Sequence, residues 1–363
     1  MRKAMKILFV FFVPSGGMET LNRLRCQALK KRGIECHCLY FMHGAGMQNY
    51  NDTPTFFTNE DQKIQHIVAQ GSYAAIIVVS AYEFVQKLRE FGYEGLIIFE
   101  VQGYGEMGAA HKELTKAAPH LLPHANALLN PKTPYISDIF STLFPHMRKY
   151  EFNNCLDTKA FTYRSLPKKP FPIIAWIGRL EERDNKNWRE FLIIGHHLLQ
   201  HNPKIQLWMF EDANLASPEE RVQFEQMVHT LQLNQHLVLQ SNVPNRQMPD
   251  YFSMIGDSGG MYCCTSKSEG GPFAVLEAMS CRCPVLTTDS SGVRSSVLPH
   301  VTGIYYTLGN IQEAVYFALQ LMRNDSLRHT IVDNAQKHVK AHFSIEQYCS
   351  QFIAMLQDLG AKK

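Results

Sequence analysis

Two glutamates, Glu269 and Glu277, stand eight positions apart in the second half of the chain. Glu269 opens a glycine-rich turn directly after the apolar run 260–264. Glu277 lies in the segment that follows, whose apolar spacing is typical of a helix. Eight helical residues span about 12 Å, which is the reach of a nucleotide diphosphate-sugar. One carboxylate could accept hydrogen bonds from sugar hydroxyls and the other from a ribose, so the pair suits an activated sugar.

Two cations, Arg179 and Lys186, follow another apolar run at 172–177, and Arg183 lies between them. Cations at the carboxyl end of a strand are placed to neutralise a diphosphate leaving group. Surface charges on a loop would give the same sequence, so this segment alone leaves both interpretations open.

Paired glycines, Gly16 and Gly17, follow the first apolar run, 6–13. Such a pair lets the backbone approach a ligand closely, and the N-terminus of the helix behind it attracts anions. A tight turn without a ligand would look the same. The segment has neither the G-x-G-x-x-G spacing of dinucleotide-binding folds nor the Gly-Lys-Ser/Thr of a P-loop, so hydride chemistry is not supported.

The bulk composition sets limits on the class of protein. A chain of 363 residues suits two domains, and a net charge of +3 is too small to indicate a nucleic-acid partner. The basic excess around 23–32 is either a solvated helix face or a contact with an anionic membrane surface or acceptor. The nine cysteines are odd in number, scattered and without zinc-ligand spacing. We therefore expect reduced packing residues in a reducing compartment.

Short apolar runs alternate with helical patterns along the whole chain. Strands are expected at 6–13, 35–41, 74–80, 95–101, 125–129, 172–177, 204–210, 237–240, 260–264, 284–288 and 303–306. Helices are expected at 18–32, 60–69, 82–91, 110–117, 187–200, 217–230, 246–253, 272–279, 311–322, 326–340 and 345–358. Strands that are apolar throughout predict parallel sheets covered on both faces. The alternation, present twice, predicts an α/β protein with two doubly wound domains.

The segment from Glu269 to Val285 resembles the signature of the retaining family 4 glycosyltransferases (glycosyl transferases group 1), which have the GT-B fold. Further similar stretches are Gly16-Gly17-Met18-Glu19, Asn154 to Phe161, Gly178-Arg179-Leu180 and Phe343-Ser344-Ile345-Glu346. The resemblance implies two Rossmann-like domains facing across a cleft: an acceptor-side domain at 1–166 and a donor domain at 167–343. It also implies a closing helix, 344–363, that packs back on the first domain.

The resemblance assigns a role to each matching position. Glu269 would contact the donor sugar, Glu277 the ribose, Arg179 and Lys186 the diphosphate, and Gly17 the donor phosphate. Gly16, in the same glycine loop as Gly17, would also lie at the donor-binding site, and backbone amides at Gly270, Gly271, Phe273 and Ala274 would complete the phosphate cradle. No metal or cofactor is implied, because the two cations and a helix N-terminus stabilise the charge.

The chain departs from the family pattern next to the reacting sugar. Gln102 stands where the family usually carries a His, and a glutamine can donate a hydrogen bond but cannot exchange a proton near neutral pH. A same-face transfer, in which the leaving phosphate takes the acceptor's proton, is compatible with Gln102. His111 and Glu106 are nearby substitutes, but a surface or packing role explains each of them better. The spacing from Arg179 to Lys186 is longer than usual, so Arg183 could share the phosphate role.

We therefore expect a cytoplasmic, metal-independent hexosyltransferase that retains the sugar's configuration. Its donor would be a nucleotide-diphosphate sugar and its acceptor a glycan, a lipid-linked compound or a cell-envelope component, as in polysaccharide biosynthesis. Contact with the inner face of the membrane through the basic first domain is a further expectation. Two alternatives remain: a catalytically weak nucleotide-sugar-binding protein, and another GT-B activity such as an epimerase or phosphorylase.

Overall fold

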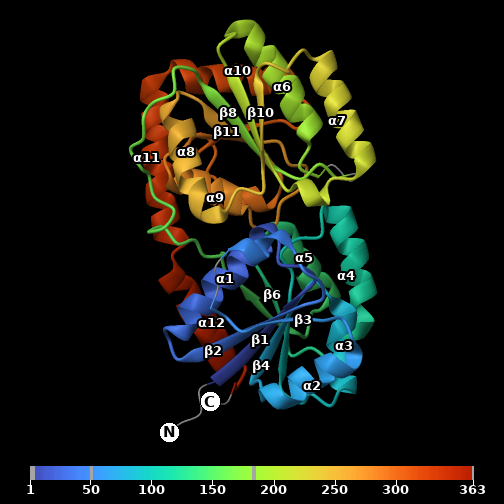
Figure 1. Ribbon diagram of the computed structural model, residues 1–363. Helices are drawn as coiled ribbons and strands as arrows, with labels where there is room; N and C mark the ends of the chain where they lie inside the picture. The colour runs from blue at the N-terminus through green and yellow to red at the C-terminus, as the bar shows by residue number, and fades with distance from the viewer. Residues whose placement is uncertain (1–4, 50–51, 182–184, 362–363) are drawn as a thin grey trace. The chain divides into compact units, whose positions relative to one another are not determined.

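The computed structural model describes residues 5–49, 52–181 and 185–361. The chain divides into two compact units, each with its own parallel sheet (Figure 1). Unit 1 comprises Met1–Cys155 and Phe343–Lys363, and unit 2 comprises Leu156–His342. Each unit has its own apolar core, so each is described by itself.

Unit 1 contains a seven-stranded sheet in the order β3-β2-β1-β4-β5-β6-β7 within its described residues. All neighbouring strands are parallel. The strands are β1 Met5–Phe11, β2 Ile34–Tyr40, β3 Thr55–Phe57, β4 Ala75–Val79, β5 Leu96–Glu100, β6 Ala127–Asn130 and β7 Arg148–Glu151. The helices are α1 Gly16–Lys30, α2 Asp61–Gly71, α3 Tyr82–Glu90, α4 Met107–Leu121, α5 Pro134–Leu143 and α12 Ile345–Asp358. Successive strands are added to one side of β1 up to β3 and to the other side from β4 onward, so the strand order reverses between β1 and β4. Doubly wound folds bind ligands at such a reversal, at the carboxyl ends of the strands.

Unit 2 contains a six-stranded parallel sheet in the order β10-β9-β8-β11-β12-β13, again within the described residues. Its strands are β8 Ile173–Gly178, β9 Gln206–Glu211, β10 Leu237–Ser241, β11 Met261–Cys264, β12 Val285–Thr288 and β13 Ile304–Tyr306. Its helices are α6 Trp188–His201, α7 Pro218–Thr230, α8 Met248–Asp257, α9 Phe273–Ser280, α10 Ile311–Arg323 and α11 Asp325–His342. Here the reversal lies between β8 and β11, so the loops after these two strands flank the expected binding position.

The two units divide at Cys155, earlier than the boundary after residue 166 that the sequence suggests. The segment after Cys155 is bonded to unit 2. The Arg164 backbone N–H donates to the Ser253 hydroxyl at 3.0 Å, and the Arg164 guanidinium pairs with Asp250 at 2.8 Å. The proline-rich stretch that follows is therefore a part of unit 2 and not the point of division.

A buried arginine joins the last helix to the sheet of unit 1. Arg25 of α1 donates to Glu100 at 2.7 Å and to the Tyr348 hydroxyl of α12 at 3.4 Å. Its guanidinium also lies 3.8 Å from the centre of the Phe9 ring. Burial opposes the charge on Arg25, but Glu100 and Tyr348 outweigh it and raise the pKa of the guanidinium. Helix α12 (red) therefore lies against α1 (blue) in Figure 1 as a part of the unit 1 core.

Replacing Arg25 with Met should destabilise the protein strongly, because Glu100 would keep a buried charge without its partner. Removing one member of a buried ion pair costs about 3–5 kcal/mol. Lys63→Met is the matched control, since Lys63 forms an exposed pair with Glu60 at 2.7 Å and such pairs contribute about 0–1 kcal/mol. Urea unfolding followed by circular dichroism measures both. Equal losses in the two variants would contradict the structural role of Arg25.

Candidate functional site

The loop after β11 is hydrogen-bonded to backbone groups of the loop after β8, and these contacts fix the backbone of Lys186. The Thr265 hydroxyl lies 2.8 Å from the carbonyl oxygen of Lys186. The Lys267 N–H donates to the Asn185 carbonyl at 2.8 Å, and the Asn185 side chain donates to the Ser268 carbonyl at 3.0 Å. The segment 185–187 is thereby held against residues 265–268, at the reversal of the sheet.

A glycine at the end of β8 allows this close approach. A Cβ atom at Gly178 would lie 2.4 Å from the Trp176 ring and 2.7 Å from the Cβ of Lys186. The Trp176 indole N–H donates to the Lys186 carbonyl at 3.0 Å. Gly178 and Trp176 therefore set the position of the Lys186 backbone next to the end of β8.

Lys186 and Glu269 form an ion pair at the centre of the site. The Lys186 amine lies 2.5 Å from Oε1 of Glu269, and the Ser266 hydroxyl donates to the same oxygen at 2.6 Å. The side chains keep 30% and 11% of their exposure, so the pair is shielded but reachable. Burial opposes the charge on the Lys186 amine, but the Glu269 carboxylate more than offsets this and raises the pKa of the amine. The site therefore holds a permanent ammonium group beside a carboxylate.

Arg179 follows β8 and supplies a second cation. Its charge acts on Lys186, whose pKa it lowers slightly against the larger effect of Glu269. Within the described ranges, Arg179 makes no side-chain hydrogen bond or ion pair. Two cations thus lie near each other, and the guanidinium is not committed to a partner in this part of the chain. Arg183, which the sequence proposes as a third cation, lies outside the described residues.

A third loop, after β12, supports the turn that carries Glu269. The Gly292 N–H donates to the Glu269 carbonyl at 2.9 Å. A Cβ at position 292 would lie 1.8 Å from the Gly270 carbonyl oxygen, so no larger residue fits there without movement. The turn at Glu269 and Gly270 is therefore fixed from two sides.

Helix α9 carries the second glutamate of the pair. Glu277 is buried, and Oε1 of its carboxylate accepts a hydrogen bond from the Asn245 side chain at 3.1 Å. Phe273 and Ala274 occupy the first turn of the helix, where backbone N–H groups have no partner within the helix and can bind an anion. Gly270 and Gly271 lie on the turn that leads into this helix.

The remaining predicted residues lie in unit 1. Gly16, with a left-handed φ of 55°, opens α1 after β1, and Gly17 follows it. Gln102 follows β5, and both ends of its side-chain amide are engaged. Its Nε2 donates to Glu100 at 2.6 Å, and its Oε1 accepts from Asn154 at 2.7 Å. Glu106 and His111 are exposed.

The structure thus brings Arg179, Lys186 and Glu269 together, whereas Gly16, Gly17 and Gln102 belong to the other unit. Sequence reasoning missed the residues that hold the site in place: Thr265, Ser266, Asn245 and Gly292. Gly292, which follows the 284–288 strand, could have been identified from the sequence, because a glycine near a strand often marks a close approach of another backbone. A serine or an asparagine in a loop carries no such signal.

The described residues contain no group of three or more His, Cys, Asp and Glu side chains that could hold a metal ion. In the same part of the chain, no helix combines the length and the apolar character needed to cross a bilayer. The cysteines, including Cys264 beneath the site, are buried and free.

Residues 159–338 match the family model described as glycosyl transferases group 1. This segment, close to half of the chain, therefore belongs to the glycosyl transferases group 1 family. Among curated proteins, glycosyltransferase 1 domain-containing protein 1 of Xenopus tropicalis is 37% identical over 83 residues. The matched region is 23% of this chain and also spans only 23% of that relative's length.

Two solved structures resemble the chain over nearly its whole length. Sucrose-phosphate synthase from Thermosynechococcus elongatus has a TM-score of 0.80 at 15% identity and covers 98% of this chain and 99% of that one. HepE from Anabaena, in complex with UDP-glucose, has a TM-score of 0.81 at 16% identity and covers 98% and 100%. These likenesses show that the chain has the GT-B fold predicted from its sequence.

Gly292→Ala should destabilise unit 2, because the added methyl group would meet the Gly270 carbonyl. Overpacking of this kind costs about 1–3 kcal/mol. Gly108→Ala is the matched control: it lies in α4, no atom lies within 4 Å of its Cβ position, and alanine favours a helix over glycine by about 1 kcal/mol. The midpoint of urea unfolding should fall in the first variant and stay or rise in the second. A midpoint that is unchanged in Gly292→Ala would show that the turn is not tightly fixed.

Proposed function

We propose that this protein is a retaining glycosyltransferase that moves a sugar from a nucleotide-diphosphate sugar to an acceptor hydroxyl. The observation that carries the proposal is the grouping of Arg179, Lys186 and Glu269 at the reversal of the unit 2 sheet. Two cations suit a diphosphate, and a carboxylate beside them suits the hydroxyl groups of the attached sugar.

The two cations would stabilise the charge that develops on the departing diphosphate. Lys186 has further N–H donors beyond the one that contacts Glu269, and the Arg179 guanidinium can bind a phosphate through two parallel hydrogen bonds. The N–H groups at Phe273 and Ala274 and the turn at Gly270 and Gly271 would add donors to the same group. These charges and dipoles would do the work of a metal ion, so we propose transfer without one and without a cofactor.

Glu269 and Glu277 would hold the two polar ends of the donor. In this assignment Glu269 accepts hydrogen bonds from the sugar, and Glu277 accepts them from the ribose. The hydrogen bond from Asn245 keeps one oxygen of Glu277 in a fixed direction. Burial of Glu277 strengthens its hydrogen bonds to a ligand, because little water competes for them.

The proton of the acceptor would leave with the diphosphate. On the face from which the diphosphate departs, the acceptor oxygen forms its bond to the anomeric carbon while the carbon–oxygen bond to the phosphate breaks. The acceptor proton passes to an oxygen of the leaving phosphate. Gln102 fits this route as a hydrogen-bonding residue, because its amide is fixed by Glu100 and Asn154 and it exchanges no proton. Gly16 and Gly17 would contact the donor phosphate through their backbone.

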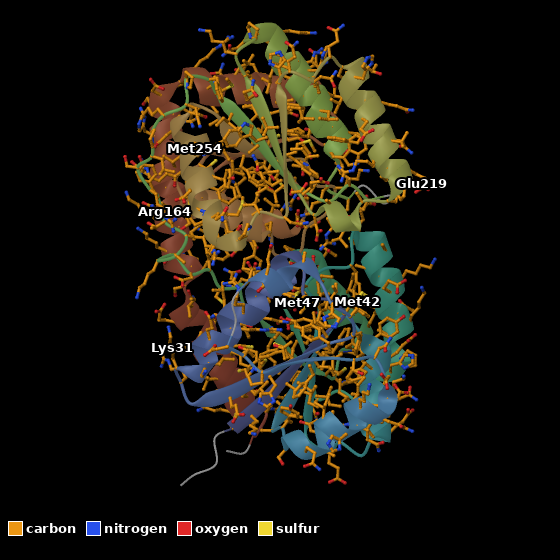
Figure 2. The ribbon with its side chains drawn as sticks, in the orientation of Figure 1. Lys31, Met42, Met47, Arg164, Glu219 and Met254 are labelled. Atoms are coloured by element: carbon orange, nitrogen blue, oxygen red, sulfur yellow. The ribbon has the colours of Figure 1, made fainter. Side chains whose placement is uncertain are left out.

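Unit 1 would bind the acceptor, which we propose to be a glycan or a lipid-linked compound of polysaccharide biosynthesis in the cytoplasm. Lys30, Lys31 and Arg32 are exposed at the end of α1 (Lys31 is labelled in Figure 2). Such a cluster would favour peripheral contact with an anionic membrane. A test is co-sedimentation with anionic and neutral vesicles: stronger binding to the anionic ones is expected.

A catalytically weak nucleotide-sugar-binding protein is the second candidate. The engaged amide of Gln102 favours it, because Nε2 already donates to Glu100 and Asn154 and Oε1 already accepts from Asn154, which leaves only the second lone pair of Oε1 for a substrate. The two candidates differ in turnover. Release of nucleoside diphosphate that depends on an added acceptor supports the transferase, whereas binding without release supports the weak binder.

Glu269→Gln and Arg179→Ala should each lower sugar transfer by about 100-fold or more, because each removes a charge from the reacting centre. Glu219→Gln is the control for the loss of a carboxylate, since Glu219 is exposed at the start of α7 (Figure 2). Transfer is measured as nucleoside diphosphate released in the presence of acceptor. Turnover in Glu269→Gln that equals turnover in Glu219→Gln would refute the assignment.

The donor can be identified with a thermal-shift panel of UDP-, GDP- and ADP-sugars. A compound that binds the native state raises the melting temperature. At least one sugar nucleotide should do so with the wild-type protein. No shift with any of them would contradict the proposed function as a whole.

A further inference from the structure

The two carboxylate oxygens of Glu269 have different surroundings. Oε1 accepts hydrogen bonds from both Lys186, at 2.5 Å, and Ser266, at 2.6 Å. Oε2 has no hydrogen-bond or ion-pair partner among the described residues. A carboxylate with one oxygen held twice cannot rotate freely, so the direction of its second oxygen is fixed as well.

The hydroxyl proton of Ser266 points toward Glu269. The thiol of Cys264 lies 3.5 Å from the Ser266 hydroxyl and donates to it, so a lone pair of the hydroxyl is occupied. An ionised carboxylate has no proton to give, which means that Ser266 must donate to Glu269. The three side chains therefore form a chain of hydrogen bonds that runs from Cys264 to the carboxylate.

The Ser266 side chain is also fixed in place. It is buried, and the backbone carbonyl of the same residue accepts a hydrogen bond from the Thr288 hydroxyl of β12 at 2.5 Å. A buried side chain on a fixed backbone holds one rotamer, so it can direct the group that it contacts. Ser266 differs in this respect from Lys186, whose long side chain is partly exposed and is assigned to the diphosphate.

We propose that Ser266 is a positioning residue: it holds Oε1 of Glu269 so that Oε2 accepts hydrogen bonds from the sugar of the donor. This inference rests on the proposed function and deepens it. Ser266 then lets the site distinguish a nucleotide-sugar from the nucleoside diphosphate alone, because the sugar is the part of the ligand that Oε2 contacts. When Lys186 turns toward the diphosphate, the Ser266 hydrogen bond remains and keeps the carboxylate directed.

The test compares two ligands in four proteins by isothermal titration calorimetry. The ligands are the glucose nucleotide that binds the wild type most tightly among UDP-, GDP- and ADP-glucose, and its matching nucleoside diphosphate. The proteins are the wild type, Ser266→Ala, Ser266→Thr and Ser290→Ala. Ser290→Ala is the matched control, because Ser290 is also a buried serine and its hydroxyl has no partner in the described structure.

Ser266→Ala should weaken binding of the glucose nucleotide about tenfold or more, as expected for a lost hydrogen bond to a charged group. Binding of the nucleoside diphosphate should stay within about twofold, since its contacts do not involve Oε2. Ser266→Thr keeps the hydroxyl and should restore most of the selectivity, and Ser290→Ala should match the wild type. Urea unfolding of all four proteins shows whether the fold is kept.

The inference is overturned if Ser266→Ala weakens both ligands equally, which would indicate a general effect on the loop. It is also overturned if neither ligand is weakened. A wild-type protein that binds none of the glucose nucleotides or nucleoside diphosphates contradicts the proposed function itself. A wild type that binds both, together with an unselective Ser266→Ala, contradicts only the role of Ser266.

Discussion

The contact between Lys186 and Glu269 joins the loops that follow β8 and β11, and the rest of the candidate site is arranged around it. Taking either charge out of water alone is unfavourable, and each is tolerated because the other lies beside it. Hydrogen bonds from the Thr265 hydroxyl and the Lys267 N–H hold the two loops together, so the ion pair does not have to do so by itself. A ligand that meets this pair finds the charges already oriented, which lowers the cost of ordering them.

Unit 1 contains a comparable ion pair that is more deeply buried. Arg25 and Glu100 retain 0% and 1% of their side-chain exposure, whereas Lys186 and Glu269 retain 30% and 11%. The first pair is closed to any ligand and serves to connect helices and sheet. The second remains reachable, and that difference is why the chemistry is assigned to unit 2. Gln102 lies next to the closed pair, and its hydrogen bonds to Glu100 and Asn154 connect it to the core.

The sequence predicted both sheets and most of their helices, because buried parallel strands leave apolar runs that can be read directly. It missed β3 and β7, which are short strands at the two edges of the unit 1 sheet and have partly exposed side chains instead of an apolar run. It also missed α5, which begins with Pro134. Arg179, Lys186 and Glu269 were proposed from residue type and spacing, and the structure places them near one another. The contacts of Ser266 and Asn245 depend on loops that meet only in the folded chain, so no local pattern could reveal them.

The division of unit 1 into two stretches of sequence has a consequence for biosynthesis. Its core needs α12, whose Phe352 ring centre lies 5.9 Å from the ring centre of Phe9 in the first strand, yet α12 follows the whole of unit 2 in the sequence and is made after it. Unit 2, in contrast, is continuous from Leu156 to His342. Since domains generally fold as they emerge during translation, α12 must emerge from the ribosome before unit 1 can complete its core. Unit 2 can complete its core earlier. The part of unit 1 that precedes unit 2 in the sequence therefore keeps some apolar surface exposed until α12 has been made.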